Sequence, residues 1–240
     1  IVFSDLRGDD NIQSEILHYE GGIRQFVEHI HKVKGLDPLS DKVIYVSGSK
    51  GDSTAEIALQ WNDSYNEDIR SFANNIHTVD GGTHETGFKN ALTKVINEYG
   101  KKFNLIKDNA DKLIGDDVRE GLTAIISVKL TNCEFEGQTK AKLGNASMRT
   151  LVSNIVTQQL TEFLEENPAV GKLILDKAMM ANRAREAARK AREAIRRKTG
   201  LESGQMPDKL RDCNDTDPTL TELYIVEGDS AGGSAKEGRD

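Results

Sequence analysis

The chain has 240 residues and a formal net charge of −7, and Cys133 and Cys213 are its two cysteines. This length is enough for one or two domains with buried cores. We expect neither a signal peptide nor a membrane helix, because no apolar run reaches the about 18 residues that cross a bilayer. The two cysteines lack metal-ligand spacing, which argues against a zinc site and favours free thiols in a reducing cytoplasm.

The first third of the chain alternates strand and helix patterns. Residues 1–17 predict a strand that continues into a polar hairpin, and an amphipathic helix follows Gly21-Gly22. Two strands are expected at 42–47 and 55–61. In the second of them apolar side chains alternate with small or polar ones, which predicts burial of one face only.

The middle of the chain repeats this alternation with longer helices. A turn at 80–82 leads into a helix that runs through Tyr99, and a β-rich run follows at 122–130. A polar loop at 136–145 separates this strand from a helix at 147–166. Together these patterns predict a mixed arrangement of helices and strands.

A long helix is predicted at 170–198, about 40 Å in length at ~1.5 Å per residue. An apolar seam at heptad-like spacing predicts packing against one neighbour: Ile174, Ala181, Ala184, Ala188, Ala191 and Ile195. A linker rich in Gly, Asp and Pro follows at 200–218.

This long helix also concentrates positive charge. Nine basic and two acidic residues between Lys177 and Lys198 give that segment +7 and leave −14 for the rest of the chain. Two interpretations stay open: a solvated charged helix, or contacts with nucleic-acid phosphates that weaken as salt rises. For the second, the candidate residues are Arg189, Arg192, Arg196 and Arg197.

The loop around Lys140 is a second candidate for phosphate binding. Gly137 and Gly144 flank Gln138-Thr139-Lys140, and flexible backbone around a lysine suits a mobile point charge. The Walker phosphate-binding pattern is absent. By itself the segment is more typical of an ordinary surface loop.

The segment 221–235 predicts a strand, a turn and a helix start, with Glu227 directly after the apolar run. In α/β folds the carboxyl ends of strands carry ligands, and Mg²⁺ takes one or two protein carboxylates. Glu227 is therefore a candidate Mg²⁺ ligand or general acid-base, against a plain strand-turn-helix. A serine-protease nucleophile at Ser230 is disfavoured, because Ala231 stands where a glycine belongs and the chain is rich in helix.

The histidines offer weaker signals. His29 and His31 lie two residues apart on a predicted helix and face different directions, so a shared metal is not expected. His84, beside Gly81-Gly82, is expected to act as a structural hydrogen-bonding group rather than as a base.

Six motifs, in order along nearly the whole chain, resemble B subunits of bacterial type IIA topoisomerases, and of DNA gyrase in particular. They are Tyr19–Ile23, Asn74–Thr78 with Gly81–Phe88, Asp117–Leu122, Gln138–Lys140 with Lys142–Asn145, Lys209-Leu210 with Asp212-Cys213, and Glu227–Lys236.

The resemblance implies a domain order. Residues 1–17 would end a GHKL-type ATPase domain, and 18–170 would form a transducer domain with a left-handed βαβ crossover. Residues 171–220 would form the long basic helix and linker, and 221–240 would begin a Rossmann-like Toprim domain with its first strand. The sequence is thus expected to be an internal fragment that is inactive by itself.

The resemblance also implies roles and partners. Lys140, with Gln138 beside it, would contact the γ-phosphate of ATP, and Glu227 would bind Mg²⁺ and assist DNA strand cleavage. The partners would be double-stranded DNA and a gyrase A subunit that carries the nucleophilic tyrosine, in an assembly of two A and two B subunits. The whole enzyme would supercoil DNA in the bacterial cytoplasm, associated with the nucleoid and with no membrane partner.

Two departures and two alternatives accompany this interpretation. A proline-containing stretch of the family is replaced by Thr131-Asn132-Cys133, which bears on how stiffly Lys140 is held, and a Pro-Gly turn is replaced by Pro207-Asp208. The alternatives are a topoisomerase IV B subunit, which relaxes and decatenates DNA, and a non-catalytic nucleic-acid-binding module that uses the arginine-rich helix.

Overall fold

The computed structural model describes residues 1–7, 13–103, 106, 112–202, 215 and 217–238, with side chains in these ranges except at 195–202 and 236. The chain divides into two units, residues 1–184 and 185–240. Each unit is described by itself.

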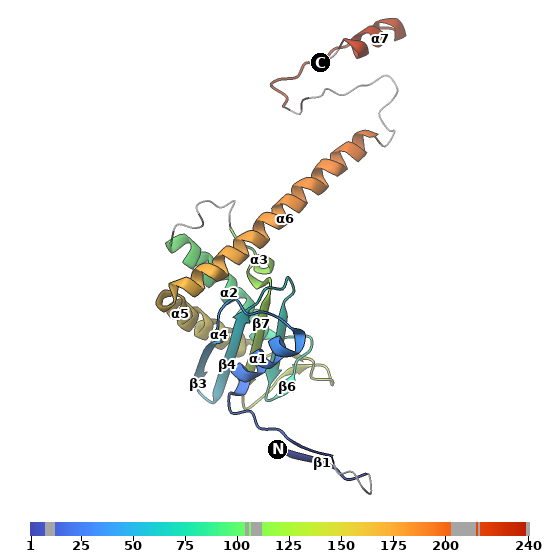
Figure 1. The fold of residues 1–240 in the computed structure, drawn as a ribbon. Coiled ribbons are helices and arrows are strands. Elements are labelled where there is room, and N and C mark those ends of the chain that lie inside the picture. The colour runs from blue at the N-terminus through green and yellow to red at the C-terminus, as the bar shows by residue number, and fades with distance from the viewer. Residues whose placement is uncertain (8–12, 104–105, 107–111, 203–214, 216, 239–240) are drawn as a thin grey trace. The chain divides into compact units, whose positions relative to one another are not determined.

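A five-stranded sheet forms the centre of the first unit (Figure 1). Its strands, in spatial order, are β3 (Ile44–Lys50), β4 (Ser53–Trp61), β7 (Leu122–Lys129), β5 (Asp68–Ala73) and β6 (Ile76–His77). Neighbouring strands run antiparallel except β5 and β7, which are parallel. A parallel pair needs a crossover connection, and the helices between β6 and β7 provide it. The mixed α/β architecture expected from the sequence is confirmed.

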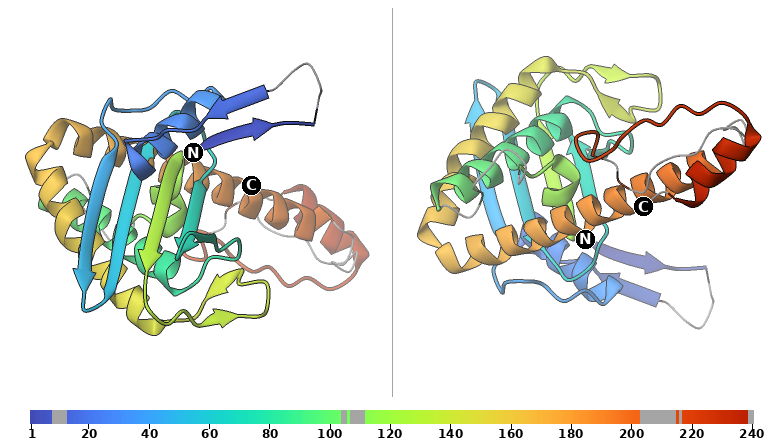
Figure 2. Two further views of the ribbon diagram at one scale, coloured as in Figure 1. Left: turned by 90° about the horizontal axis from the view of Figure 1, so that it is seen from below. Right: turned by 90° about the horizontal axis from the view of Figure 1, so that it is seen from above.

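Helix α1 (Gly22–Lys34) covers one face of this sheet (Figure 2). Val27 and Ile30 of α1 form a small core with Ala58 of β4 and Ile125 of β7. The prediction that the strand at 55–61 is buried on one face only is therefore wrong. Ala58 is fully buried, because its small side chain lets the helix approach the sheet closely.

The other face carries the main core. Helix α2 (Thr83–Lys102) places Phe88 and Leu92 there, and α3 (Gly115–Arg119) completes the connection to β7. Phe88 is fully enclosed. The burial of such large side chains supplies most of the free energy that holds this layer together.

A continuous helical segment lies next to α2. It consists of α4 (Ala146–Ile155), a π-helical stretch η2 (Val156–Leu160) and α5 (Thr161–Glu166). The helix predicted at 147–166 is thus confirmed, and its irregular turn was not predicted. One residue in this stretch, Gln159, hydrogen-bonds the edge strand β3, which gives the irregular turn a local role.

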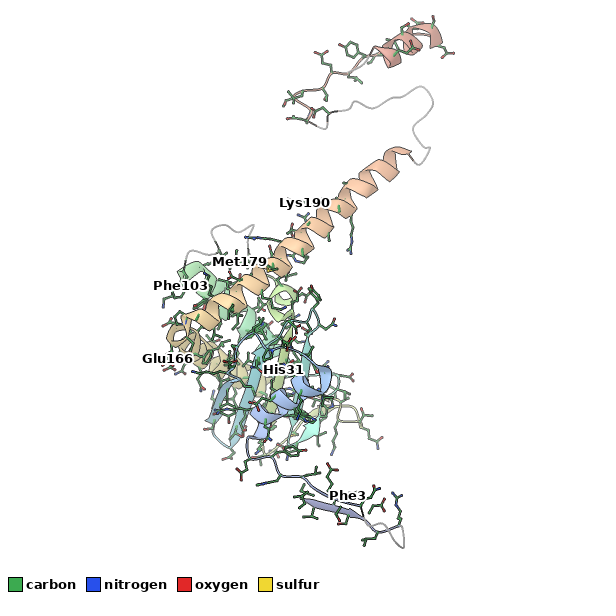
Figure 3. The ribbon with its side chains drawn as sticks, viewed as in Figure 1. Phe3, His31, Phe103, Glu166, Met179 and Lys190 are labelled. Atoms are coloured by element: carbon green, nitrogen blue, oxygen red, sulfur yellow. The ribbon has the colours of Figure 1, made fainter. Side chains whose placement is uncertain are left out.

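Helix α6 (Pro168–Glu202) confirms the long helix predicted at 170–198. Its apolar seam is only partly used: Ile174 and Ala181 are buried, whereas Ala184, Ala188 and Ala191 are exposed. Met179, labelled in Figure 3, packs against the main core as a partly buried residue. The seam therefore packs into the core of the first unit only as far as about residue 184, where that unit ends. The side chain of Ile195 lies outside the described residues.

Two hairpins are separate from the central sheet. Strand β1 (Val2–Asp5) pairs antiparallel with β2 (Gln13–Ile16), as the pattern at 1–17 predicts, and Phe3 is exposed on β1 (Figure 3). The turn residues between them lie outside the described residues. Strand β8 (Phe135–Glu136) pairs antiparallel with β9 (Lys142–Leu143), so the loop expected at 136–145 contains a short ladder.

The strand expected at 221–226 is not formed. Residues 221–227 have no regular secondary structure, and Leu223 and Ile225 are strongly exposed. A strand requires a neighbour for its backbone hydrogen bonds, and none of the described strands pairs with this segment. The predicted helix start is confirmed, since α7 (Asp229–Glu237) begins directly after Gly228. Among the described residues, no helix is long and apolar enough to cross a membrane.

Candidate functional site

The β8–β9 hairpin presents Lys140 at its tip. Lys140 has a left-handed backbone conformation, with a φ of 54°, and Gly137 has a φ of 79°. The amide of Lys140 donates to the carbonyl of Gly137 over 3.4 Å, which closes the turn. A left-handed conformation is uncommon for a residue with a side chain and persists where the surroundings determine it. The hairpin thus holds Lys140 in a defined conformation, with its side chain exposed.

The start of α2 holds one side of this hairpin. The amide of Leu143 donates to the carbonyl of Gly81 over 3.1 Å, and the amide of Asp80 donates to the carbonyl of Ala141 over 2.9 Å. Gly82 forms a parallel bridge with Leu143, and a Cβ atom on Gly82 would lie 2.5 Å from the Leu143 carbonyl oxygen. Only glycine allows this approach, because Gly82 also has a φ of 144°.

Asn145 holds the other side of the hairpin. Its side-chain oxygen accepts from the amide of Glu134 over 2.8 Å, and its side-chain nitrogen donates to the carbonyl of Asn132 over 3.0 Å. Its carbonyl accepts from the Thr83 hydroxyl over 2.7 Å. The hydrogen bond from Asn145 restrains the backbone at Asn132, within the stretch Thr131-Asn132-Cys133.

The charge of Lys140 is available to an external anion. Within the described part of the chain Lys140 forms no ion pair, whereas Lys142 pairs with Glu136 over 2.9 Å. Burial raises the pKa of the Cys133 thiol, and the positive charge of Lys140 opposes that rise. Gln138 is exposed on the same loop and adds an amide that can hydrogen-bond a phosphate oxygen. The sequence-predicted pair Gln138 and Lys140 therefore lies together.

Glu227 lies in a different environment. It is exposed, follows the irregular segment 221–226 and precedes Gly228, whose φ is 84°. Asp229 is in the first turn of α7. An exposed carboxylate can serve as one of the one or two protein ligands of a Mg²⁺ ion, yet the described residues contain no group of three or more potential metal ligands. The described residues alone therefore do not complete a metal site.

The basic segment of α6 is partly neutralised by its own glutamates. Arg189 pairs with Glu186 over 2.7 Å and with Glu193 over 2.8 Å. Arg192 is exposed and has no ion pair within the described ranges. Exposed pairs contribute little free energy, so Arg189 can exchange its partners for phosphates. The side chains of Arg196 and Arg197 lie outside the described residues.

Lys190, labelled in Figure 3, projects from the same segment and is likewise exposed. It also lacks an ion pair among the residues with described side chains. Lys190 is thus an exposed cation of this segment that was not among the residues predicted from the sequence to contact phosphates.

A buried polar cluster beneath the Lys140 hairpin was missed by sequence reasoning, apart from His84. It consists of Ser71, Thr78, His84 and Glu85. The hydroxyl oxygens of Ser71 and Thr78 lie 2.7 Å apart, the Ser71 hydroxyl donates to Glu85 Oε2 over 2.9 Å, and Thr78 Oγ1 lies 3.2 Å from His84 Nε2. Burial lowers the pKa of His84 to about 4. A neutral, enclosed imidazole fits the expected structural role, and burial likewise lowers the pKa of His31.

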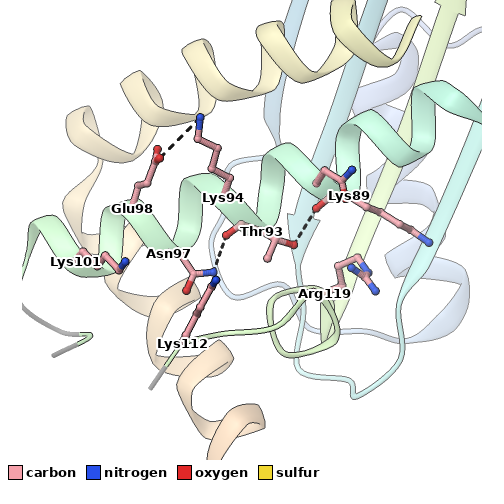
Figure 4. A pocket seen from close by; sticks show the side chains of 10 residues that line it. Lys89, Thr93, Lys94, Asn97, Glu98, Lys101, Lys112 and Arg119 are labelled. Carbon is pink, nitrogen blue, oxygen red and sulfur yellow. Dashed lines mark hydrogen bonds and ion pairs between the residues drawn. The ribbon is translucent and has the colours of Figure 1, made fainter. Parts of the chain in front are cut away.

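A groove of about 480 Å³ runs along α2 and α3 (Figure 4). Several of its lysines and arginines are already paired: Lys89 with Glu67 and Glu85, Arg119 with Glu67 and Asp116, and Lys94 with Glu98. The groove is lined mainly by charged and amide side chains and by no large apolar side chain, so it is less typical of a small-molecule site than of a solvated surface.

Comparison with known proteins gives consistent matches. The DNA gyrase B family model matches residues 22–194. The chain is 56% identical over 241 residues to the DNA gyrase B subunit of Clostridium acetobutylicum, which covers 100% of this chain and 37% of that protein. For the DNA gyrase B subunit of Halalkalibacterium halodurans the identity is 52% over 240 residues, with the same 100% and 37% coverage. The chain thus spans little more than a third of the length of these two curated relatives.

Solved structures show the same fold. The 43K ATPase domain of Thermus thermophilus gyrase B, in complex with an aminocoumarin, matches with a TM-score of 0.69 and 41% identity, over 76% of this chain and 48% of that chain. The topoisomerase IV ATP-binding domain of Francisella tularensis matches with a TM-score of 0.59 and 31% identity, over 73% and 46%.

The family model covers well over half of the sequence, and the relatives match it from end to end. The loop with Lys140 and the glycines that hold it lie inside the matched range. The chain belongs to the DNA gyrase B family.

Proposed function

We propose that this chain transmits the state of bound ATP to a DNA-cleaving site in a gyrase-type topoisomerase. In this proposal residues 1–17 end an ATPase domain and 18–170 form the transducer. Residues 171–220 form the long helix and linker, and 221–240 begin a Toprim domain. The presentation of Lys140 on a doubly anchored hairpin is the observation that carries the proposal.

ATP would supply a γ-phosphate within reach of Lys140 and Gln138. A lysine that contacts the γ-phosphate interacts with ATP but not with ADP. ATP binding would therefore favour the position of the transducer in which this contact forms, and hydrolysis would remove that preference. The left-handed backbone at Lys140 and the hydrogen bonds at both ends of the hairpin support this role. They reduce the conformational entropy that the loop loses when the phosphate binds.

The second unit would bind DNA and Mg²⁺. Arg192 and Arg189 would contact phosphates, together with Arg196 and Arg197, and Glu227 would contribute one carboxylate to a Mg²⁺ ion that other residues complete. The bound ion would stabilise negative charge at the scissile phosphate. The partner would be a gyrase A subunit in a heterotetramer of two A and two B subunits, in the bacterial cytoplasm and at the nucleoid.

The first test is Lys140→Ala in a full-length subunit that carries this sequence, reconstituted with its A subunit. Loss of a charge that stabilises the reacting phosphate should lower ATP turnover and supercoiling by about 100-fold, while DNA binding persists. Lys142→Ala is the matched control, because Lys142 lies two residues away but pairs with Glu136. Unchanged ATP turnover in Lys140→Ala, measured by phosphate release, would contradict the assignment.

The second test is Glu227→Ala in the same reconstituted enzyme. If Glu227 holds the ion, DNA cleavage should fall by about 100-fold or more, and ATP turnover should change little. Glu222→Ala removes an exposed carboxylate from the same segment, one that accepts a hydrogen bond from Tyr224, and should leave cleavage near its normal yield. A normal amount of cleaved DNA with Glu227→Ala would refute the role.

The related topoisomerase IV activity is the second candidate. The greater identity to the gyrase B structure, 41% against 31% for the topoisomerase IV domain, favours gyrase. Incubation of the reconstituted enzyme with relaxed plasmid and ATP separates the two. Negative supercoils indicate gyrase, whereas relaxation and decatenation without supercoiling indicate topoisomerase IV.

A further inference from the structure

The polar cluster of Ser71, Thr78, His84 and Glu85 joins the start of α2 to the central sheet. Ser71 lies on β5 and Thr78 follows β6, whereas His84 and Glu85 are in the first turn of α2. Ser71, Thr78 and His84 are at most 2% exposed. The Thr78 hydroxyl also donates to the Ser71 carbonyl over 2.9 Å. Both hydroxyls are paired inside this buried network, so a shift that separates β5, β6 and the start of α2 would leave these hydroxyls without partners.

The same short segment that the cluster holds also carries the Lys140 hairpin. The amide of Gly81 donates to the carbonyl of Thr78 over 2.9 Å, so a tight turn connects the cluster to Gly81-Gly82. The Gly81 carbonyl in turn accepts from Leu143, and Gly82 bridges Leu143 directly. A continuous chain of hydrogen bonds therefore runs from Ser71 on the sheet to the strand that follows Lys140.

Gly82 and Leu143 are so close that the start of α2 has no space to shift toward the hairpin. The Cβ position of Gly82 lies within 3 Å of three atoms of Leu143. Leu143 is itself fully buried, so it cannot retreat. A change in the first turn of α2 must therefore move the hairpin, and with it the backbone of Lys140.

We propose that Ser71 and Thr78 are positioning residues for Lys140, acting through Gly81-Gly82 to set where its ammonium group meets a phosphate. This proposal rests on the proposed function of Lys140. Displacement of a reacting or binding group by about 1 Å can cost about 100-fold in rate, so the contribution of such a network is measurable.

The test is Thr78→Val in the full-length subunit, which removes the hydroxyl but keeps the shape of the side chain. We expect the kcat for ATP hydrolysis to fall about tenfold with little change in the KM for ATP. Thr78→Ser restores the hydroxyl and should restore kcat. Thr93→Val is the matched control, because the Thr93 hydroxyl bonds the Lys89 carbonyl on α2 far from the hairpin. If Thr78→Val does not fold, Ser71→Ala takes its place, since it leaves the Thr78 hydroxyl bonded to the Ser71 carbonyl.

A double-mutant cycle separates positioning from general loss of structure. If Thr78 acts through Lys140, then Thr78→Val should have no further effect on kcat in the Lys140→Ala background. Additive losses would overturn the proposal, as would an unchanged kcat in Thr78→Val when Lys140→Ala is impaired. An unchanged kcat in Lys140→Ala itself would instead contradict the proposed function.

Discussion

His84 shows how burial sets the ionisation of a single residue. Its imidazole is completely enclosed at the start of α2, where Nε2 faces Thr78 and Nδ1 has no hydrogen-bond partner among the described residues. A charged imidazole there would lose its hydration without gaining a compensating partner. Burial accordingly lowers the pKa from 6.5 to about 4, although the nearby Glu85 charge acts in the opposite direction.

This pKa predicts a loss of stability in mild acid. Above pH 6.5 His84 is neutral in both states and has no effect, whereas between pH 6.5 and 4 only the unfolded chain takes up the proton. His84 should therefore reduce the free energy of unfolding by roughly 3 kcal/mol as the pH falls to 4. Urea titrations that follow the fluorescence of Trp61, the single tryptophan and part of the main core, measure this.

The comparison uses two variants. His84→Gln keeps a hydrogen-bonding group that does not ionise, so its stability should depend less on pH, even if it is lower at pH 7. His29→Gln replaces an exposed histidine on α1 and should follow the wild-type pH dependence. Equal pH dependence in the wild type and His84→Gln would contradict the assignment.

The π-helical stretch η2 illustrates what an element contributes beyond its length. Gln159 lies within this stretch, and its side chain reaches β3, an edge strand of the sheet. The Ser47 amide donates to Gln159 Oε1 over 3.1 Å, and Gln159 Nε2 donates to the Ser47 carbonyl over 2.6 Å. The amide thus pairs with the edge as a neighbouring strand would, which leaves Ser47 unavailable to another chain. A π-helical turn contains one residue more than an α-helical turn. This changes the direction of its side chains and allows Gln159 to point toward β3.

Gln159→Leu should lower the free energy of unfolding by about 1–3 kcal/mol, because both backbone groups of Ser47 lose a half-buried partner. It should also increase self-association at high concentration, through the opened edge. Gln158→Leu is the control: the neighbouring residue is exposed, so its effect should stay within about 0.5 kcal/mol. Urea unfolding and light scattering measure both quantities, and equal stability of the two variants would refute this role for Gln159.

At the scale of the whole molecule, charge is strongly segregated. The segment 177–198 carries +7 within a chain of net charge −7. DNA repels a protein of net negative charge at long range. Attraction between the basic segment and DNA phosphates therefore operates at short range, where salt screens the charges least. Arg183, Lys190 and Arg192 are exposed cations of this segment without ion pairs among the described residues, which makes them stronger candidates than the paired Arg189.

The isolated chain should therefore bind duplex DNA weakly and in a salt-dependent manner. We expect the logarithm of the binding constant to fall with the logarithm of salt concentration, with a slope of about −3 to −5. Replacement of Lys190 and Arg192 by glutamate should make the slope shallower by about 2, whereas Lys32→Glu on α1 should not. Fluorescence anisotropy of labelled DNA measures the slope, and an unchanged value in the double variant would exclude this segment as the contact.

Much of the fold could be predicted because local pattern and tertiary packing agree. The helical spacing after Gly21-Gly22 predicts α1, and the alanine-rich run predicts α6 within four residues at either end. The prediction of a strand at 221–226 is wrong because local pattern and tertiary packing disagree there. Its apolar pattern favours a strand, but a strand forms only with a partner, and none of the described strands supplies one.

For the candidate site, the sequence predicts which residues are suited to contact a phosphate or a metal: Lys140 with Gln138, the arginines of α6 and Glu227. It also determined membership of the family, since ordered motifs are local strings. The hydrogen bonds by which Ser71 and Thr78 join the sheet to the segment that holds the Lys140 hairpin, and those by which Asn145 restrains the base of the hairpin, could not be predicted from the sequence. These hydrogen bonds join strands, turns and a helix that are far apart in the sequence, and single hydroxyls leave no periodic pattern by which to recognise them.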